Sequence, residues 1–222
     1  MQAPVLKKCD LYAEVEQFRR NVKITPQHYP LNSLCLANYL GLRTKIMDFE
    51  TQGLKGALIL KNNTDGCVFL DERQSPAERN FFCSHEIMHY ILHRGLGDPV
   101  FACYDAQPQQ SRIREWQANE GAAELLLPYR MFIPDFLNLF NPLTCWGDIF
   151  NAYTVLAARY NVSSMVVQNR VESLTYEIYQ AAYGYPIDFI SVISRREQAQ
   201  RGISVPSCHS IGLQSAFHAY NK

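Results

Sequence analysis

The sequence lacks an excess of either charge. Its 222 residues include 21 lysines and arginines and 21 aspartates and glutamates, so the formal net charge is zero. Proteins whose main task is to bind a polyanion are usually basic overall, so direct binding of nucleic acid is disfavoured. The chain also lacks a run of 18 apolar residues, and no apolar stretch follows the lysines near its start. We therefore expect no membrane association, neither through a transmembrane helix nor through a signal peptide.

Paired cysteines are missing as well. The seven cysteines are scattered, odd in number and never arranged as Cys-x-x-Cys. A disulfide framework fits this pattern poorly, whereas a reduced cytoplasmic protein fits it well. A chain of this length can bury a substantial core without cross-links, as one domain or as two small ones.

The stretch His85-Glu86-Ile87-Met88-His89 has the form H-E-x-x-H. On a helix its two histidines lie one turn apart on the same face, so one Zn²⁺ could take an imidazole nitrogen from each at about 2.0–2.1 Å. Glu86 would lie beside the metal without binding it, where it could accept a proton from an attacking water molecule. Because three fixed positions also occur by chance, a surface helix whose histidines bind nothing is the alternative.

A helix is expected around this motif. Ser75-Pro76-Ala77-Glu78 forms a capping box with proline at the first helical position. Apolar residues continue to about His93, after which Gly95 and Gly97 should end the helix. The motif therefore lies inside a capped, apolar helix, which is the rigid setting that zinc chemistry needs.

Two histidines leave one protein ligand to be found, and His93 does not fit the role. His85 and His93 are separated by about 12 Å of helix rise, so both cannot bind one ion together with His89. The longer motif H-E-x-x-H-x-x-G-x-x-H also fails, because Leu92 stands where glycine is needed and Gly95 where histidine is needed. His93 is better explained as a helix C-terminal residue favoured by the helix dipole, and the third ligand should come from a second helix.

The best second helix runs from about Ser111 to Leu127, and three of its glutamates compete for the metal. At about 100° per residue, a helix that turns Glu115 toward the metal places Asn119 roughly 40° away, where its amide could hold the other ring nitrogen of a histidine. Glu120 lies roughly 140° from Glu115 and is the reserve ligand, whereas Glu124 should face solvent. Glu115 could also be an ordinary first-turn acid that stabilises the helix N-terminus.

The N-terminal sequence predicts two further helices and a small sheet. Helices are expected at about Leu11–Val22 and Pro30–Leu40, and strands at Gly56–Leu60, at Cys67–Leu70 and, as a further candidate, at Arg43–Phe49. Turn residues between the two main strands predict a hairpin. The predicted fold class is α+β and mainly helical, with a small antiparallel sheet beside a zincin-like two-helix metal site and with a C-terminal helical region. The sheet edge could bind substrate as an added strand, or the hairpin could simply cover the core.

Residues 146–176 have the pattern of a helix-turn-helix pair. The turn would fall at Asn161, which tolerates a left-handed backbone, and Ser163 would cap the second helix. A DNA-reading helix should present several polar or basic side chains at its start, but between Ser163 and Arg170 the arginine is the single cation. We therefore favour a structural helical pair over DNA binding.

The sequence beyond about residue 180 matches no pattern that we recognise. A helix is expected at about Asp188–Gln200. Cys208, His209 and His218 are isolated potential ligands, and isolated residues of this kind are more often without a metal.

Residues of both metal helices carry a family resemblance: His85-Glu86-x-x-His89, Glu115-x-x-Ala118-Asn119 and Ala122-Ala123-x-Leu125-Leu126-x-Pro128. With these motifs the chain resembles the ImmA/IrrE family of zinc metallopeptidases over about residues 10–175. Two positions depart from the usual pattern of that family. Met88 replaces a small residue before the second histidine, and Gly121 replaces a large apolar residue at a cost of about 1 kcal/mol in helix stability relative to alanine.

The resemblance implies a zinc-dependent endopeptidase of the cytoplasm whose substrate is a cognate helix-turn-helix transcriptional repressor. The expected division is a zincin-like metallopeptidase domain at residues 1–140, a helix-turn-helix-like helical subdomain at 141–180, and an extension of unknown role at 181–222.

The favoured hypothesis is that one Zn²⁺ held by His85, His89 and Glu115 activates water, while Glu86 accepts the proton and passes it to the leaving amine. The candidates for stabilising the oxyanion are Tyr104, Tyr129 and His93. Two hypotheses from other classes compete with this one. The first is a non-enzymatic regulator that binds DNA or a partner through residues 146–176, and stoichiometric zinc would argue against it. The second is a toxin or binding module whose catalysis is suppressed, and only a substrate assay would exclude it.

Overall fold

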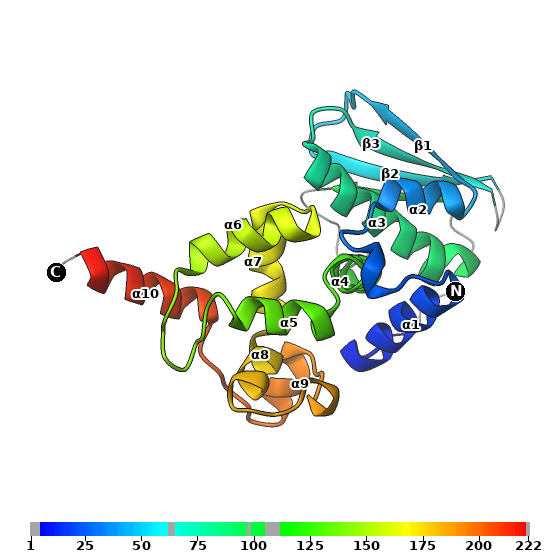
Figure 1. The fold of residues 1–222 in the computed structure, drawn as a ribbon. Helices are drawn as coiled ribbons and strands as arrows, with labels where there is room; N and C mark the ends of the chain where they lie inside the picture. Colours follow the sequence, from blue (N-terminus) through cyan, green and yellow to red (C-terminus); the bar gives the residue numbers. More distant parts are fainter. Residues whose placement is uncertain (1–4, 62–64, 97–98, 105–111, 221–222) are drawn as a thin grey trace. The chain divides into compact units, whose positions relative to one another are not determined.

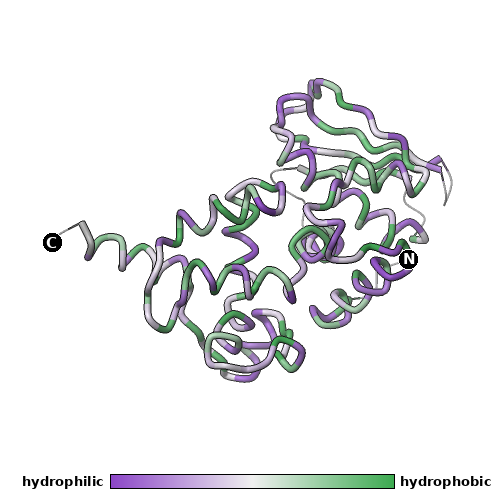
Figure 2. The backbone as a smooth tube through the Cα atoms, in the orientation of Figure 1, coloured by the Kyte–Doolittle hydropathy of each residue, from purple (hydrophilic) through white to green (hydrophobic). Residues whose placement is uncertain are grey.

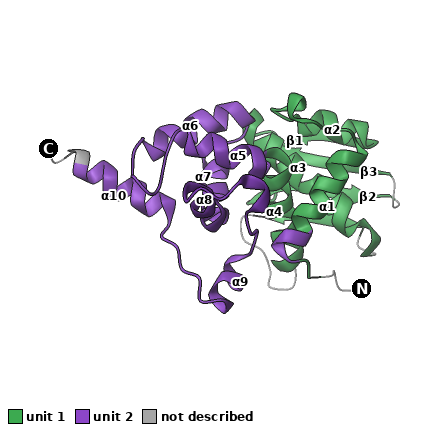
Figure 3. Cartoon of the chain, turned by 60° about the horizontal axis from the view of Figure 1, so that its bottom comes forward, with its two compact units in different colours: residues 1–6, 11–126 green, residues 7–10, 127–222 purple. Residues whose placement is uncertain are grey.

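The computed structural model describes residues 5–61, 65–96, 99–104 and 112–220. Its contacts divide the chain into two compact units, of which unit 1 comprises residues 1–6 and 11–126 and unit 2 comprises residues 7–10 and 127–222 (Figure 3). This division falls after Leu126 rather than at the predicted residue 140. The physical reason is that helix α5 (Tyr129–Leu137) packs on the helices that follow it in unit 2.

A four-stranded sheet forms one layer of unit 1 (Figure 1). Its strands are β1 (Leu42–Met47), β2 (Leu54–Leu60), β3 (Gly66–Asp71) and β4 (Val100–Tyr104), in the order β1-β3-β2-β4. The predicted hairpin is confirmed as the antiparallel β2–β3 pair, and the third candidate strand is confirmed as β1. The prediction of an antiparallel sheet is wrong for one pair, because β1 runs parallel to β3. The hairpin places β3 between β1 and β2. Because β1 and β2 run in opposite directions, β3, which reverses direction after β2, runs parallel to β1.

Strand β4 was not predicted from the sequence. It is five residues long and pairs with β2, with Val100 opposite Ile59. So short a segment shows no clear alternation of polar and apolar residues, and only its pairing with β2 makes it a strand. Part of the predicted turn between β2 and β3 lies outside the described residues.

Helix α3 (Pro76–His93) packs on β2 and β3 and also on α4 (Arg112–Leu126). Strands β2 and β3 are hydrophobic along most of their length, so apolar burial holds α3 against the sheet (Figure 2). The predicted capping box is present: the Ser75 hydroxyl accepts the Glu78 N–H, and the Glu78 carboxylate accepts the Ser75 N–H at 2.8 Å. The first predicted metal helix is therefore confirmed at both ends.

Two further helices complete unit 1 as far as the structure describes it. The expected opening helix is α1 (Lys8–Asn21), which begins earlier than predicted. The second is α2 (Ser33–Tyr39), which starts later than the predicted Pro30 because the side chain of Asn32 caps it by accepting the Cys35 N–H. The second predicted metal helix is confirmed as α4, although Ser111 lies outside the described residues.

The two departures from the family pattern meet where α3 crosses α4. Met88 is fully buried, and a Cβ added to Gly121 would lie 2.9 Å from the Met88 sulfur and 3.1 Å from its Cγ. The large residue on α3 therefore occupies the space that a large residue on α4 would need. The helix-stability cost of Gly121 is offset by burial of Met88, which typically contributes about 1.5–3 kcal/mol.

We expect these two positions to be energetically coupled. Met88→Ala should leave a cavity that destabilises the protein by about 2–5 kcal/mol, and Gly121→Leu should overpack the crossing by about 1–3 kcal/mol. The double variant should be more stable than the sum of these losses implies, with a coupling free energy of about 0.5–3 kcal/mol. Denaturant unfolding of the four proteins measures the coupling, and a strictly additive double variant would contradict the packing exchange.

Unit 2 is helical in its described residues. Besides α5 it contains α6 (Ile149–Tyr160), α7 (Ser164–Ser173), α8 (Thr175–Ala182), α9 (Arg195–Gln200) and α10 (Cys208–Tyr220). The helix predicted at Asp188–Gln200 is too long, because Ser194 and Glu197 form a capping box that starts α9 at Arg195. Asp188 lies instead in a short 3-10 turn.

The helix-turn-helix pattern is confirmed as the α6–α7 pair. Asn161 adopts the left-handed conformation with φ 53° and ψ 50°, and the Ser163 hydroxyl caps α7 by accepting the Val166 N–H. The arginine counted as the single cation, Arg170, is 1% exposed and donates a hydrogen bond to the Leu127 carbonyl at 3.1 Å. This guanidinium is therefore committed to the interior of unit 2.

Two further observations concern the whole chain. All seven cysteines carry free thiols. Within the described residues, no helix combines the length and the apolar character that crossing a membrane requires.

Candidate metal centre

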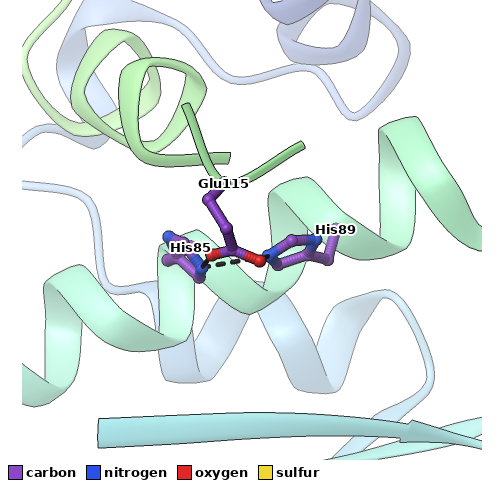
Figure 4. Close-up of side chains that lie close together, drawn as sticks. All are labelled: His85, His89 and Glu115. Atoms are coloured by element: carbon purple, nitrogen blue, oxygen red, sulfur yellow. Dashed lines mark hydrogen bonds and ion pairs between the residues drawn. The ribbon is translucent and has the colours of Figure 1, made fainter. Parts of the chain in front are cut away.

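The structure brings His85, His89 and Glu115 together in unit 1. The two histidines lie on α3, and Glu115 descends from α4 between them (Figure 4). The Nε2 atoms of the histidines are 3.0 Å apart, and the Glu115 oxygens lie 3.3 Å from His85 Nε2 and 3.4 Å from His89 Nε2. Among the described residues, these three form the group of His, Cys, Asp and Glu side chains whose ligand atoms all lie within 4.8 Å of one another.

The competing glutamates lie elsewhere. Glu120 accepts a hydrogen bond from the Tyr12 hydroxyl of α1, which turns its carboxylate away from the histidines. The prediction that Glu124 faces solvent is wrong: it is 1% exposed and lies 3.8 Å from the Arg19 guanidinium. The helical wheel placed Glu124 opposite Glu115 correctly, but α1 covers that face of α4. Of the three glutamates, Glu115 is the one beside the histidines.

Asn119 lies where the helical periodicity of α4 predicted it. Its Oδ1 is 3.0 Å from His85 Nδ1. Because an amide oxygen can only accept, Nδ1 of His85 carries the proton of this hydrogen bond, which leaves Nε2 as the nitrogen able to bind a metal. Asn119 therefore turns the metal-binding nitrogen of His85 toward His89 and Glu115.

His93 is not part of the ligand group, as the helix rise predicted. Its position differs from the expected cationic C-terminal residue, because it is 1% exposed and burial lowers its pKa. Its Nδ1 lies 3.0 Å from His89 Nδ1, and its Nε2 lies 2.9 Å from Oε1 of Gln117. Gln117 was not predicted from the sequence, because it is roughly 200° around α4 from Glu115 and has no motif position that points to the site.

Burial sets the charge state of His89. Desolvation lowers its pKa to about 4, so the ring is neutral near pH 7. A metal-binding imidazole must be neutral, and His89 is in that form at neutral pH.

Glu86 is buried directly beside this group and has a different environment. Neither of its carboxylate oxygens has a hydrogen-bond partner among the described residues. Burial raises the pKa of Glu86 well above its ordinary value, and the charge of Glu115 raises it further. Gly56 of β2 makes room for this side chain, because a Cβ at that position would lie 3.0 Å from Glu86 Oε1. A carboxyl group with a raised pKa is suited to accept and return a proton near neutral pH.

The donor set fits a divalent transition metal such as zinc. Two imidazole nitrogens and one carboxylate, with a fourth position left for water, form a common set for catalytic zinc. Ligands at about 2.0–2.1 Å from a tetrahedral ion stand roughly 3.3 Å apart, close to the 3.0–3.4 Å separations of these atoms. Without a cation, the inward-facing lone pairs would repel one another in a dry interior. The fold and site therefore define a metal-dependent hydrolase of the H-E-x-x-H class.

Comparison with known proteins identifies the family within this class. Residues 37–172 match the IrrE N-terminal-like domain, the model of peptidase family M78. The match covers more than half of the chain, so the protein belongs to this family, and the resemblance found in the sequence is confirmed. A search of curated proteins found no match. The family and the site together establish a metallopeptidase-type function.

The structure gives less support to the other residues named from the sequence, as oxyanion stabilisers or as further metal ligands. Both ring nitrogens of His93 are engaged by other side chains, so it is a poor oxyanion stabiliser. The side chain of Tyr104 lies outside the described part of the chain, and Tyr129, which belongs to unit 2, stays a prediction. Among the described residues, Cys208, His209 and His218 join no group able to hold a metal.

Proposed function

We propose that the metal is zinc and that the protein is an endopeptidase that cleaves a specific protein substrate. The observation that carries the proposal is the convergence of His85, His89 and Glu115 on one point with Glu86 buried beside them. His85, His89 and Glu115 would hold the ion. When bound, zinc supplies a Lewis acid that polarises a carbonyl and makes water nucleophilic near neutral pH.

Glu86 is the general base and then the general acid of this mechanism. Its oxygens, which have no hydrogen-bond partner among the described residues, can accept the proton of the attacking water, and the raised pKa lets the carboxyl hold that proton until the amine leaves. Asn119 keeps His85 in the tautomer that binds metal. The apolar wall around the site, which includes Phe101 stacked 4.9 Å from the His89 ring, excludes bulk water.

We further propose that the substrate is a cognate helix-turn-helix repressor and that cleavage takes place in the cytoplasm. Family resemblance supports the first statement, and the seven free thiols agree with a reducing compartment. Direct binding of DNA is a weaker proposal, since Arg170 is buried and the formal net charge is zero. The α6–α7 pair therefore serves as structure in this proposal.

The test is incubation of the zinc-loaded protein with any helix-turn-helix repressor that a neighbouring gene encodes. Intact-mass spectrometry should show two fragments that add up to the repressor plus one water, from a single internal peptide bond. The Glu86→Gln protein should leave the repressor intact. If zinc binds but no neighbouring repressor is cut, the substrate assignment fails and the metal centre stands.

A further inference from the structure

Three side chains in contact with one another lead from α4 to His89, one of the two histidines of the metal centre. Gln117 of α4 contacts His93, and His93 contacts His89, with distances of 2.9 Å from Gln117 Oε1 to His93 Nε2 and 3.0 Å between the two Nδ1 atoms. All three residues are 1% exposed. Water is thus excluded from these nitrogens, so their hydrogen bonds must be made with other protein groups.

The acceptor at the outer end fixes the direction of these hydrogen bonds once a metal occupies the inner end. A metal on Nε2 of His89, the atom that faces His85 and Glu115, would leave the proton of that ring on Nδ1. His89 would then donate from Nδ1 to Nδ1 of His93, and His93 would donate from Nε2 to the Gln117 carbonyl oxygen, which can only accept. Every hydrogen bond between the three side chains is satisfied in this state.

We propose that Gln117 and His93 are positioning residues that set the tautomer of His89 and hold its Nε2 lone pair ready for the metal. The inference rests on the proposed function, because it concerns how a ligand is presented to zinc. If the Gln117 amide were turned, its NH₂ group would donate to His93. Each proton would then shift along the chain, and His89 would carry hydrogen on the nitrogen that must bind metal.

Helix α4 therefore serves the site through alternate residues, Glu115, Gln117 and Asn119. Asn119 orients His85 directly, whereas Gln117 reaches His89 through His93, which lies one turn further along α3. Phe101 of β4 packs beside both imidazoles, with its ring 4.9 Å from the His89 ring and 6.2 Å from the His93 ring. An amide group of α4 thus orients each histidine ligand, directly for His85 and through His93 for His89.

The decisive experiment is NMR of the zinc-loaded protein with ¹⁵N-labelled histidine, which identifies the protonated nitrogen of each ring. We expect protonated Nδ1 in His89 and protonated Nε2 in His93. Protonation of His93 on Nδ1 would overturn the proposal. A wild-type protein that binds no zinc would instead overturn the proposed function, so the two failures are distinguishable.

Zinc affinity of matched variants tests the consequence. Gln117→Leu removes the acceptor and should weaken zinc binding about 10–100-fold in a chelator competition. Gln117→Glu restores an acceptor and should bind zinc much more tightly than the leucine variant. Gln74→Leu is the control, because Gln74 is also buried in unit 1 but donates to the Lys55 carbonyl. Equal affinities of the Gln117→Leu and wild-type proteins would contradict the proposal, and a Gln117→Leu protein that does not fold leaves the decision to the wild-type spectrum.

Discussion

Glu86→Gln should abolish cleavage while the protein keeps its zinc. The amide has nearly the shape of the carboxyl group but cannot accept a proton from water or deliver one to the leaving amine, so the cleavage rate should fall about 10²–10⁴-fold. Glu86 is not among the ligand atoms that converge on the centre, so zinc stoichiometry should stay at one per chain. Product formation by mass spectrometry and zinc content by elemental analysis measure the two effects.

The same substitution should not lower stability. Within the part of the chain that the structure describes, both oxygens of Glu86 are buried without hydrogen-bond partners, and a neutral amide is less costly to bury than an ionised carboxylate. The matched control is Glu78→Gln on the same helix, because glutamine can still close the capping box with Ser75. An undiminished cleavage rate in Glu86→Gln would remove Glu86 from the mechanism.

Glu115→Gln should lose zinc, and Glu120→Gln should keep it. An amide oxygen is a neutral and weaker ligand than the carboxylate that lies 3.3–3.4 Å from both histidine Nε2 atoms. Replacing a residue that merely orients a ligand costs about 10–100-fold in metal affinity, so replacing the ligand should cost at least about 100-fold. Chelator competition at neutral pH measures the difference between the variants.

The paired design also separates the two glutamates that the sequence left open. The Glu120 side chain accepts from the Tyr12 hydroxyl, and a glutamine oxygen can accept the same hydrogen bond. Glu120→Gln therefore changes the charge with little change in packing. If Glu120→Gln lost the metal and Glu115→Gln retained it, the ligand set proposed here would be incorrect.

The parts of the site that lie on single helices were predictable from the sequence. Capping chemistry predicts the cap at Ser75. Helix periodicity predicts that His85 and His89 lie on one face of α3, and that Glu115 and Asn119 lie close together around α4. These are local properties, set by residues within one or two turns of each other. The exclusion of His93 as a ligand followed from helix rise alone.

Features that depend on contacts between distant segments were not predictable in this way. β4 exists because it pairs with β2, and β1 is parallel to β3 because of the order in which the hairpin enters the sheet. Glu124 is buried because α1, about a hundred residues earlier in the chain, supplies Arg19 beside it. A helical wheel records where a side chain points on its own helix and carries no information about what covers that face.

The sequence by itself determined that a capped helix would carry the H-E-x-x-H motif and that a second helix would offer glutamates to it, because period and spacing are properties of one segment. Only the tertiary structure decided which glutamate meets the histidines, how β2 makes room for Glu86 at Gly56, and how Gln117 reaches His89 through His93. Those outcomes depend on how α3 packs against the sheet and against α4, and the crossing with α4 is set by packing such as that of Met88 on Gly121.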